Sequence, residues 1–453
     1  MTQSFERHTI YPIPLTQRFG KASDLFPVWF SANMTLLTVV TGALGPVVFK
    51  LSFLWSLMAL IIGNMAGAVF MALHAAQGPQ LGVPQMVQSR GQFGLYGSVP
   101  VIGVVIIMYI GFAASNCVVG GEALSHIVPV LSGKDCILLI ALLTFIPCVL
   151  GYRVIHLCSK AASWLSAIAV LYAIICGLHA LSWSLLSDLH GSISGMLGAI
   201  SVAALWQIAY APYVSDSSRY LPLTETSVKE TFWACYGGTV IGAVLPMMLG
   251  SLLAILWPDL SPSQAIIALA GPVGHVVVWV LALAIPLGSA MSVYCGGLCI
   301  LTFLQTFYTR HNLGRSSRVM ATTLLLVVAL FIGLGMSKTF LQSYTAFLDF
   351  LLAVLVPWTA INLYDYYILK KGHYEVDDFF KPHGGRYGRL NHQAAFCYVV
   401  GVLVELPFLK TSFFTGPLVS RTGGVDISWV AGLVVTTFLY GTLYSFERYK
   451  APL

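Results

Sequence analysis

Charge is what this sequence lacks most. Asp, Glu, Lys and Arg together make up only 9% of its 453 residues, whereas soluble domains carry about 25%. Hydrophobic residues make up 57%, and the mean hydropathy is +0.83. The composition excludes an ordinary soluble protein and predicts an all-α polytopic membrane protein embedded in the lipid bilayer. The formal net charge of +6 reflects membrane orientation and requires no nucleic-acid partner.

Motifs for metal binding and catalysis are also absent. The nine cysteines are scattered along apolar segments without a Cys-x-x-Cys pair or a cluster with histidine, so we expect neither disulfides nor a metal site. No Walker, His-Glu-x-x-His or Gly-x-Ser-x-Gly motif occurs. We therefore expect no cofactor and no enzymatic activity. The polar stretch 1–26 lacks the apolar core of a signal peptide, and we expect it to be a cytoplasmic tail.

Long apolar segments predict twelve transmembrane helices. A helix needs about 20 predominantly apolar residues to cross a bilayer. The stretch 78–97 is too polar and too rich in glycine to cross, so we expect an interfacial loop there. The expected spans are 28–49, 53–76, 99–127, 136–153, 162–184, 195–215, 231–257, 274–303, 319–336, 340–368, 393–409 and 427–446.

The distribution of Lys and Arg predicts the orientation of these spans. Basic residues accumulate in cytoplasmic loops. With the N-terminus in the cytoplasm, eighteen of the 23 basic residues lie inside, and only Lys50, Lys134, Lys338, Lys410 and Arg421 lie outside. The sequence therefore predicts a multi-pass protein of the plasma (inner) membrane with both termini in the cytoplasm. We expect a monomer.

Two spans contain residues that interrupt a helix. In the first span, Pro46 cannot donate a backbone hydrogen bond, and Gly42 and Gly45 favour departure from helical geometry. The sixth span contains Pro212 among small residues. Lipid cannot satisfy the freed backbone groups, so a break must line a protein cavity or hold a ligand. For the first span alone, a kinked structural helix is the alternative.

Broken helices five spans apart are typical of an inverted repeat of five helices each, with the substrate site where the breaks meet. We therefore expect two repeats followed by two further helices. The expected parts are the tail 1–26, the first repeat 27–184, the second repeat 195–369, a cytoplasmic loop 370–392, the last two helices 393–446 and a cytoplasmic tail 447–453.

Several stretches resemble the nucleobase–cation symporter family, and within it the purine–cytosine permeases. They are TGALGP at 41–46, GPQLGVPQMVQSRGQFG at 78–94, GFAASNCVVGG at 111–121, SDSSRYLP at 215–222, NLYDYYILKKGHY at 362–374 and GGRYGRLN at 384–391. The resemblance implies the LeuT-type fold, in which two inverted repeats are followed by two extra helices. It also implies cation-coupled uptake of a small heterocycle such as a purine or cytosine, driven by Na⁺ or H⁺.

Candidate substrate-binding residues lie on four spans. In the third span, Phe112 offers an aromatic face where relatives often have Trp, and Asn116 offers both a donor and an acceptor. Ordinary helix packing and an interhelical hydrogen bond are the alternatives for these two. Trp206 and Gln207 sit just before the expected break in the sixth span. The remaining candidates are Thr38, Thr41 and Gly42 in the first span and Gly288, Ser289 and Ser292 in the eighth.

Two observations bear on the identity of the coupling ion. Sodium-coupled relatives place hydroxyl residues where this chain has Ala282 and Leu283, and Asp349 is an acid near mid-membrane depth. An intramembrane acid is a functional candidate by default. We therefore favour H⁺ over Na⁺, with Asp349 as the coupling residue and a satisfied structural carboxylate as the alternative. Asp216 and Arg219 are expected to form a gating or structural ion pair.

The sequence thus predicts a secondary active transporter that imports a nucleobase or a related small heterocycle by cation symport with alternating access. An uncoupled facilitator or channel for small polar solutes is the alternative. A channel needs a continuous polar pore, whereas the polar residues here gather near the two expected breaks.

Overall fold

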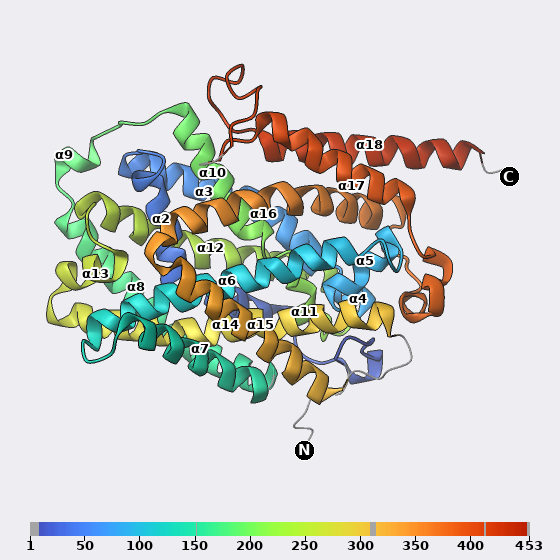
Figure 1. Cartoon of the computed structure of the whole chain (residues 1–453), viewed down its shortest axis with the longest axis horizontal. Helices are drawn as coiled ribbons and strands as arrows, with labels where there is room; N and C mark the ends of the chain where they lie inside the picture. The colour runs from blue at the N-terminus through green and yellow to red at the C-terminus, as the bar shows by residue number, and fades with distance from the viewer. Residues whose placement is uncertain (1–8, 151, 309–313, 412–413, 451–453) are drawn as a thin grey trace.

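The computed structural model describes residues 9–150, 152–308, 314–411 and 414–450 (Figure 1). Helices form nearly all of the regular structure in this part of the chain, beside one isolated β-bridge between Lys410 and Thr415. The helices are α1 Leu25–Asn33, α2 Leu36–Val47, α3 Phe53–Ala75, α4 Gly78–Leu81, α5 Gln85–Phe93, α6 Val99–Ile127, α7 Gly133–Leu150, α8 Tyr152–Ala180, α9 Trp183–Leu186, α10 Ile193–Ile208, α11 Val214–Ser218, α12 Ser227–Leu256, α13 Pro262–Ala270, α14 Pro272–Phe307, α15 Arg315–Met336, α16 Phe340–Leu363, α17 His392–Glu405 and α18 Ser428–Lys450.

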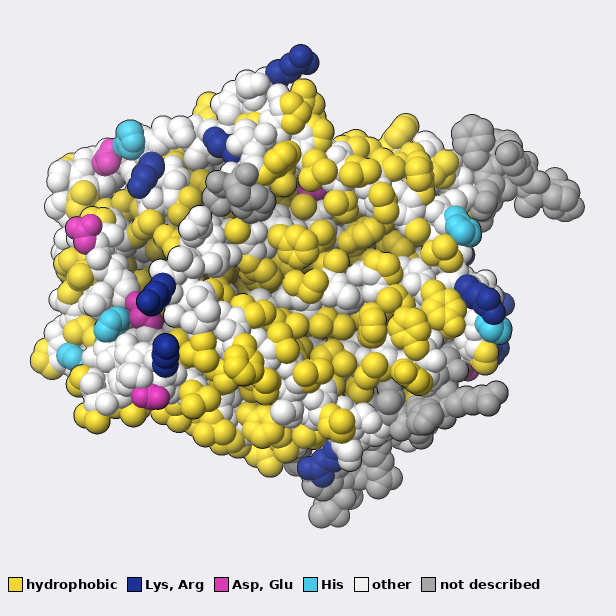
Figure 2. Space-filling view, viewed as in Figure 1, with side chains coloured by type: hydrophobic (Ala, Val, Ile, Leu, Met, Phe, Trp, Pro, Cys, Tyr) yellow, Lys and Arg dark blue, Asp and Glu magenta, His cyan; other side chains and the backbone are white. Residues whose placement is uncertain are grey.

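The distribution of side chains on the surface fits a membrane protein. Figure 2 shows a broad band of hydrophobic side chains across the middle of the molecule, with most of the charged side chains and histidines toward its left and right ends. Within the described residues, six helical stretches are long and apolar enough to cross a bilayer, and the bent pair α1–α2 makes a seventh. Four shorter apolar helices fall at other expected spans. The fold class is therefore confirmed, while the count of twelve spans remains a prediction.

The first broken helix bends at a different place from the one expected. The stretches Ala22–Asn33 and Leu36–Val47 meet at 62°, and the break lies at Met34 and Thr35. The expected break at Gly42 to Pro46 is wrong, because α2 continues through Pro46. Pro46 has no N–H for the carbonyl of Gly42, but the hydroxyl of Ser251 on α12 donates to that carbonyl at 2.8 Å. A side chain from another helix therefore repairs the hydrogen bond that proline removes.

Glycines let α12 lie close to both halves of this broken helix. A methyl group on Gly42 would come within 2.0 Å of the Met247 carbonyl oxygen, and one on Gly250 within 1.8 Å of the Val39 oxygen. Gly238 and Gly242 similarly face the backbone of α1. The backbones of α1, α2 and α12 are in direct contact, as small residues allow in membrane helices.

The second broken helix follows the sequence prediction. Helix α10 ends at Ile208, and α11 begins at Val214. The intervening residues, Ala209 to Tyr213, include Pro212. Trp206 and Gln207 therefore lie in the last turn of α10, directly before the break.

The stretch 78–97 is largely helical and buried, and not a loop on the surface. It forms α4 and α5, and every residue of α5 is buried. The guanidinium group of Arg90 donates to the carbonyl oxygens of Phe379 (3.0 Å) and Thr302 (2.9 Å), and the backbone N–H of Gln85 donates to the Asp216 carboxylate at 2.9 Å. The expected loop is wrong, because the segment is helical and partners from distant segments satisfy its polar groups inside the protein. Its position at the membrane interface stays a prediction.

Candidate functional site

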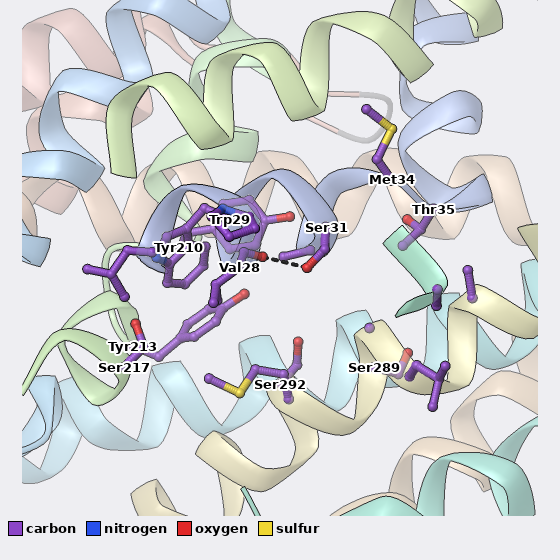
Figure 3. A pocket seen from close by; sticks show the side chains of 18 of the residues that line it. Val28, Trp29, Ser31, Met34, Thr35, Tyr210, Tyr213, Ser217, Ser289 and Ser292 are labelled. Atoms are coloured by element: carbon purple, nitrogen blue, oxygen red, sulfur yellow. Dashed lines mark hydrogen bonds between the residues drawn. The ribbon is translucent and has the colours of Figure 1, made fainter. Parts of the chain in front are cut away.

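A cavity of about 240 Å³ lies between the two broken helices. Figure 3 shows its side chains converging from α1, from the α10–α11 break and from α14. Helices α6 and α8 contribute further lining residues. The cavity reaches the exposed residues Phe19, Gly20 and Asp24 at the end of the molecule that carries the N-terminal segment. Among the described residues that line it, Asp24 is the only one with a charged side chain.

Aromatic rings form one side of the cavity. Trp29 contacts Tyr210 edge-on with ring centroids 5.4 Å apart, and Tyr210 contacts Tyr213 at 5.7 Å. Trp206 contacts Phe112 edge-on at 6.0 Å. Edge-to-face contacts of this kind hold rings in fixed relative orientations. These rings present flat apolar surfaces of the kind on which a planar ligand can stack.

Small polar groups line the cavity on α1 and also on α14, which lies across from Trp29 (Figure 3). Ser31 on α1 uses its hydroxyl to donate to the Val28 carbonyl at 2.7 Å, as the dashed line in Figure 3 shows. Ser292 on α14 also lines the cavity, near Tyr213 (Figure 3). The hydroxyl of Ser289 is buried and finds no partner within the described residues, as does that of Ser166 on α8. A buried polar group without a partner costs free energy, so these two hydroxyls favour a ligand with hydrogen-bonding atoms.

Six of the ten predicted substrate-binding residues line this cavity. They are Phe112, Asn116, Trp206, Gly288, Ser289 and Ser292. The spacing of Phe112 and Asn116 by four residues places both on the cavity face of α6, as the helical period predicts. Their contact with a ligand stays a prediction, since the lining shows their place and not what they bind.

The other four predicted residues lie outside the cavity lining. The Thr38 hydroxyl is 3.1 Å from that of Thr35, and the Thr41 hydroxyl is 2.8 Å from that of Tyr344 on α16. Gly42 contacts α12, as described above. Thr38, Thr41 and Gly42 were expected in the lining because the break was expected at Gly42 to Pro46. The actual break at Met34 and Thr35 lies about two to three turns earlier.

Gln207 points away from the cavity despite lying next to Trp206. Its side-chain amide donates to the Asn64 carbonyl oxygen at 2.6 Å, and its own oxygen accepts from the Thr239 hydroxyl. Gln207 is fully buried between α3 and α12. The neighbouring helices already satisfy this amide, which therefore does not face a molecule in the cavity.

The predicted coupling and gating residues also lie away from the cavity lining. Asp349 is half-buried on α16 and lies near Asp426, in the segment before α18. Asp216 and Arg219 are buried at 4% and 0% exposure, and Arg219 donates to the Tyr220 hydroxyl at 3.1 Å. The roles proposed for these three residues remain predictions.

Sequence analysis missed Asn33, the last residue of α1. Its side chain is fully buried and joins α1 to α12 and to the end of α10. A signal was present, because an asparagine within an apolar span must find hydrogen-bonding partners. The expected break at Gly42 to Pro46 lies about two to three turns after the actual one, so Asn33 was not among the candidates.

Comparison with known proteins identifies the family. The family model for permeases for cytosine/purines, uracil, thiamine and allantoin matches residues 12–432. The chain belongs to this permease family. The Bacillus subtilis protein YxlA, which its name assigns to the purine-cytosine permeases, is 39% identical over 442 residues, covering 97% of this chain and 95% of that protein. The purine-cytosine permease fcyB of Emericella nidulans is 23% identical and covers 98% and 89%, respectively.

Solved structures show the same fold for this permease. The transporter Mhp1, of the nucleobase-cation-symport-1 family, in a closed conformation with bromovinylhydantoin bound, matches with a TM-score of 0.80 at 17% identity. The match covers 100% of this chain and 97% of that one. The inward-facing conformation of Mhp1 matches with a TM-score of 0.74 at 16% identity, covering 100% and 96%. The LeuT-type fold expected from the resemblance is confirmed, and the permease is a transporter and not an enzyme.

Proposed function

We propose that this permease imports an uncharged nucleobase or a related small heterocycle by alternating access. The observation that carries the proposal is the cavity between the two broken helices, in which aromatic rings face neutral hydroxyl and amide groups. A heterocycle presents a flat π surface together with donors and acceptors at its edge, and the two sides of the cavity match these features. An anionic ligand would find no cation among the described lining residues.

The same proposal predicts which side of the membrane the open end of the cavity faces. With both termini in the cytoplasm of a cell bounded by its plasma membrane, the exposed end of the cavity at Phe19 and Gly20 faces the cytoplasm. Away from this end, α16 contacts two other helices. Tyr344 contacts Thr41 on α2, and Phe347 contacts Phe112 on α6. Import would end in such a state, with the cavity open on the inside and covered by α16 on the other side.

The coupling cation is H⁺ in this proposal, with Asp349 as the residue that carries it. Ala282 is fully buried without a side-chain oxygen, and Leu283 turns away from the cavity with 48% of its surface exposed. The hydroxyls expected for a sodium site are therefore lacking at these two positions. Asp349 is two residues from Phe347, which packs edge-on against Phe112 at 5.2 Å. A change in charge on Asp349 would therefore act on α16, the helix that carries Phe347.

Substrate binding is tested on purified protein with a panel of heterocycles. A ligand that binds the folded state raises the melting temperature, because it stabilises only the state that binds it. We expect neutral nucleobases to raise it in the parent and not in Trp206→Ala. Failure of every neutral heterocycle to bind would refute the proposal.

Coupling and carrier behaviour are tested in proteoliposomes. Saturable counterflow of a bound base is expected of a carrier and would be absent in an uncoupled channel. Asp349→Asn should preserve counterflow but abolish accumulation driven by a proton gradient. Glu122→Gln is the matched control, since Glu122 is also a half-buried acid in a span, and it should still accumulate substrate. Uptake that requires a sodium gradient at constant pH would contradict the assignment of H⁺.

A further inference from the structure

The side chain of Asn33 touches no part of the cavity, yet it is hydrogen-bonded to the residues that shape it. We propose that Asn33 is the positioning residue of the substrate site: it fixes the rings of Trp206 and Tyr210 and thereby the aromatic surface on which a heterocycle stacks. The inference rests on the function proposed above and gives a role to a residue outside the lining.

Both acceptor positions of the Asn33 oxygen are occupied by cavity residues. The oxygen accepts from the indole N–H of Trp206 at 2.7 Å and from the hydroxyl of Tyr210 at 3.1 Å. An amide oxygen has two lone pairs, so these two bonds complete its capacity. One atom therefore holds two rings that come from the last turn of α10 and from the break that follows it.

The amide nitrogen fixes which way the Asn33 side chain faces. It donates to the Trp29 carbonyl at 2.7 Å and to the Thr239 hydroxyl at 3.2 Å. Rotating the amide by half a turn would place its N–H groups against the N–H of Trp206, which can only donate. Only one orientation therefore satisfies all four hydrogen bonds, and α1 and α12 hold it in place.

Movement of the Trp206 ring would alter the whole aromatic side of the cavity. Trp206 contacts Phe112 edge-on at 6.0 Å and Tyr210 edge-on at 6.1 Å. Its own exposure is 5%, so apart from the cavity the protein encloses the ring. Loss of the Asn33 oxygen would leave the indole N–H short of an acceptor inside the membrane, which favours rotation of the ring toward another partner.

Ring position is measured without any ligand, by ¹⁹F NMR of protein labelled with 5-fluorotryptophan. The Trp206 resonance is assigned by its loss in Trp206→Phe. Asn33→Ala should shift or broaden this resonance. Asn33→Ser serves if the alanine variant does not fold, because a serine hydroxyl can bond to the carbonyl four residues earlier. Asn362→Ala is the matched control: Asn362 is equally buried, but it bonds to Gln77 and Gln92, outside the cavity. An unchanged Trp206 resonance in both Asn33 variants, or an equal shift in the control, would overturn the inference.

Affinity for adenine and cytosine then tests the consequence for binding. Asn33→Ala should weaken binding by about tenfold, the effect of leaving one buried donor unpaired. In the Trp206→Phe background, which has no indole N–H, the same change should weaken it by less than about threefold. An equal loss in both backgrounds would contradict positioning through Trp206. If the parent binds neither base nor any other heterocycle, the proposed function fails, while the fluorine spectra still decide the role of Asn33.

Discussion

The repair of α2 by Ser251 allows a sharp test of how this protein tolerates a proline in a membrane helix. Ser251→Ala removes the hydroxyl that donates to the Gly42 carbonyl at 2.8 Å. Pro46 cannot replace it, so the carbonyl becomes an unpaired acceptor in a buried contact between α2 and α12. Such a group costs about 1–3 kcal/mol, and hydrogen bonds between membrane helices average about 0.6 kcal/mol. We therefore expect a loss of about 1–2 kcal/mol in the free energy of unfolding.

The second half of the test restores the missing bond from within the helix. Pro46→Ala supplies an N–H to the Gly42 carbonyl, so Ser251→Ala should cost less than about 0.5 kcal/mol in that background. The free energies are measured by titration of the purified protein with a denaturing detergent. Ser115→Ala is the control, because the Ser115 hydroxyl is buried but has no partner among the described residues. An equal cost of Ser251→Ala with and without Pro46 would refute the reasoning.

Three further predictions concern topology, the loop 370–392 and substrate binding. Cysteines placed at Lys134, Lys338 and Arg421 should be labelled from outside, and cysteines at Lys229 and Lys371 from inside; the reverse would overturn the charge-based orientation. Arg219 is fully buried and is therefore unsuitable for labelling. The Lys381 ammonium, 2.6 Å away, holds the pKa of Asp378 below its usual value, as does the backbone N–H of Arg386. A lowered folded-state pKa stabilises the fold above the ordinary carboxyl pKa of about 3.9 and loses its effect as the pH falls through the folded-state pKa. Asp378→Asn should therefore increase proteolysis of the loop at neutral pH, and this difference should vanish in acid. Phe112→Ala should weaken heterocycle binding by more than about fivefold. Phe303→Ala, at a half-buried phenylalanine of α14 outside the cavity lining, should leave binding unchanged.

The fold could be predicted well from the sequence, because the sequence patterns that indicate it are local. Apolar length locates the spans, and the small residues and Pro212 correctly locate the second break. The four-residue spacing of Phe112 and Asn116 also places both on one side of a helix and into the cavity. Each of these features depends on residues within a few turns of one another.

The features that were missed depend on partners far away in the chain. Pro46 breaks no helix because Ser251 lies opposite, 209 residues later along the sequence from Gly42. Gln207 is withdrawn from the cavity by Asn64 and Thr239. The polar stretch 78–97 is buried because remote carbonyl groups accept from Arg90. No local pattern reports which distant group will satisfy a given polar atom.

The glycine contacts along α12 affect how genetic variation in this protein should be interpreted. A substitution at Gly42, Gly238, Gly242 or Gly250 would push two backbones apart, although none of these positions contacts the cavity. In a deep mutational scan that selects for uptake, these four positions should tolerate as little change as Trp206. Abundance at the membrane separates the two groups: variants at the glycines should be lost from it, whereas Trp206 variants should accumulate there normally and fail only in transport.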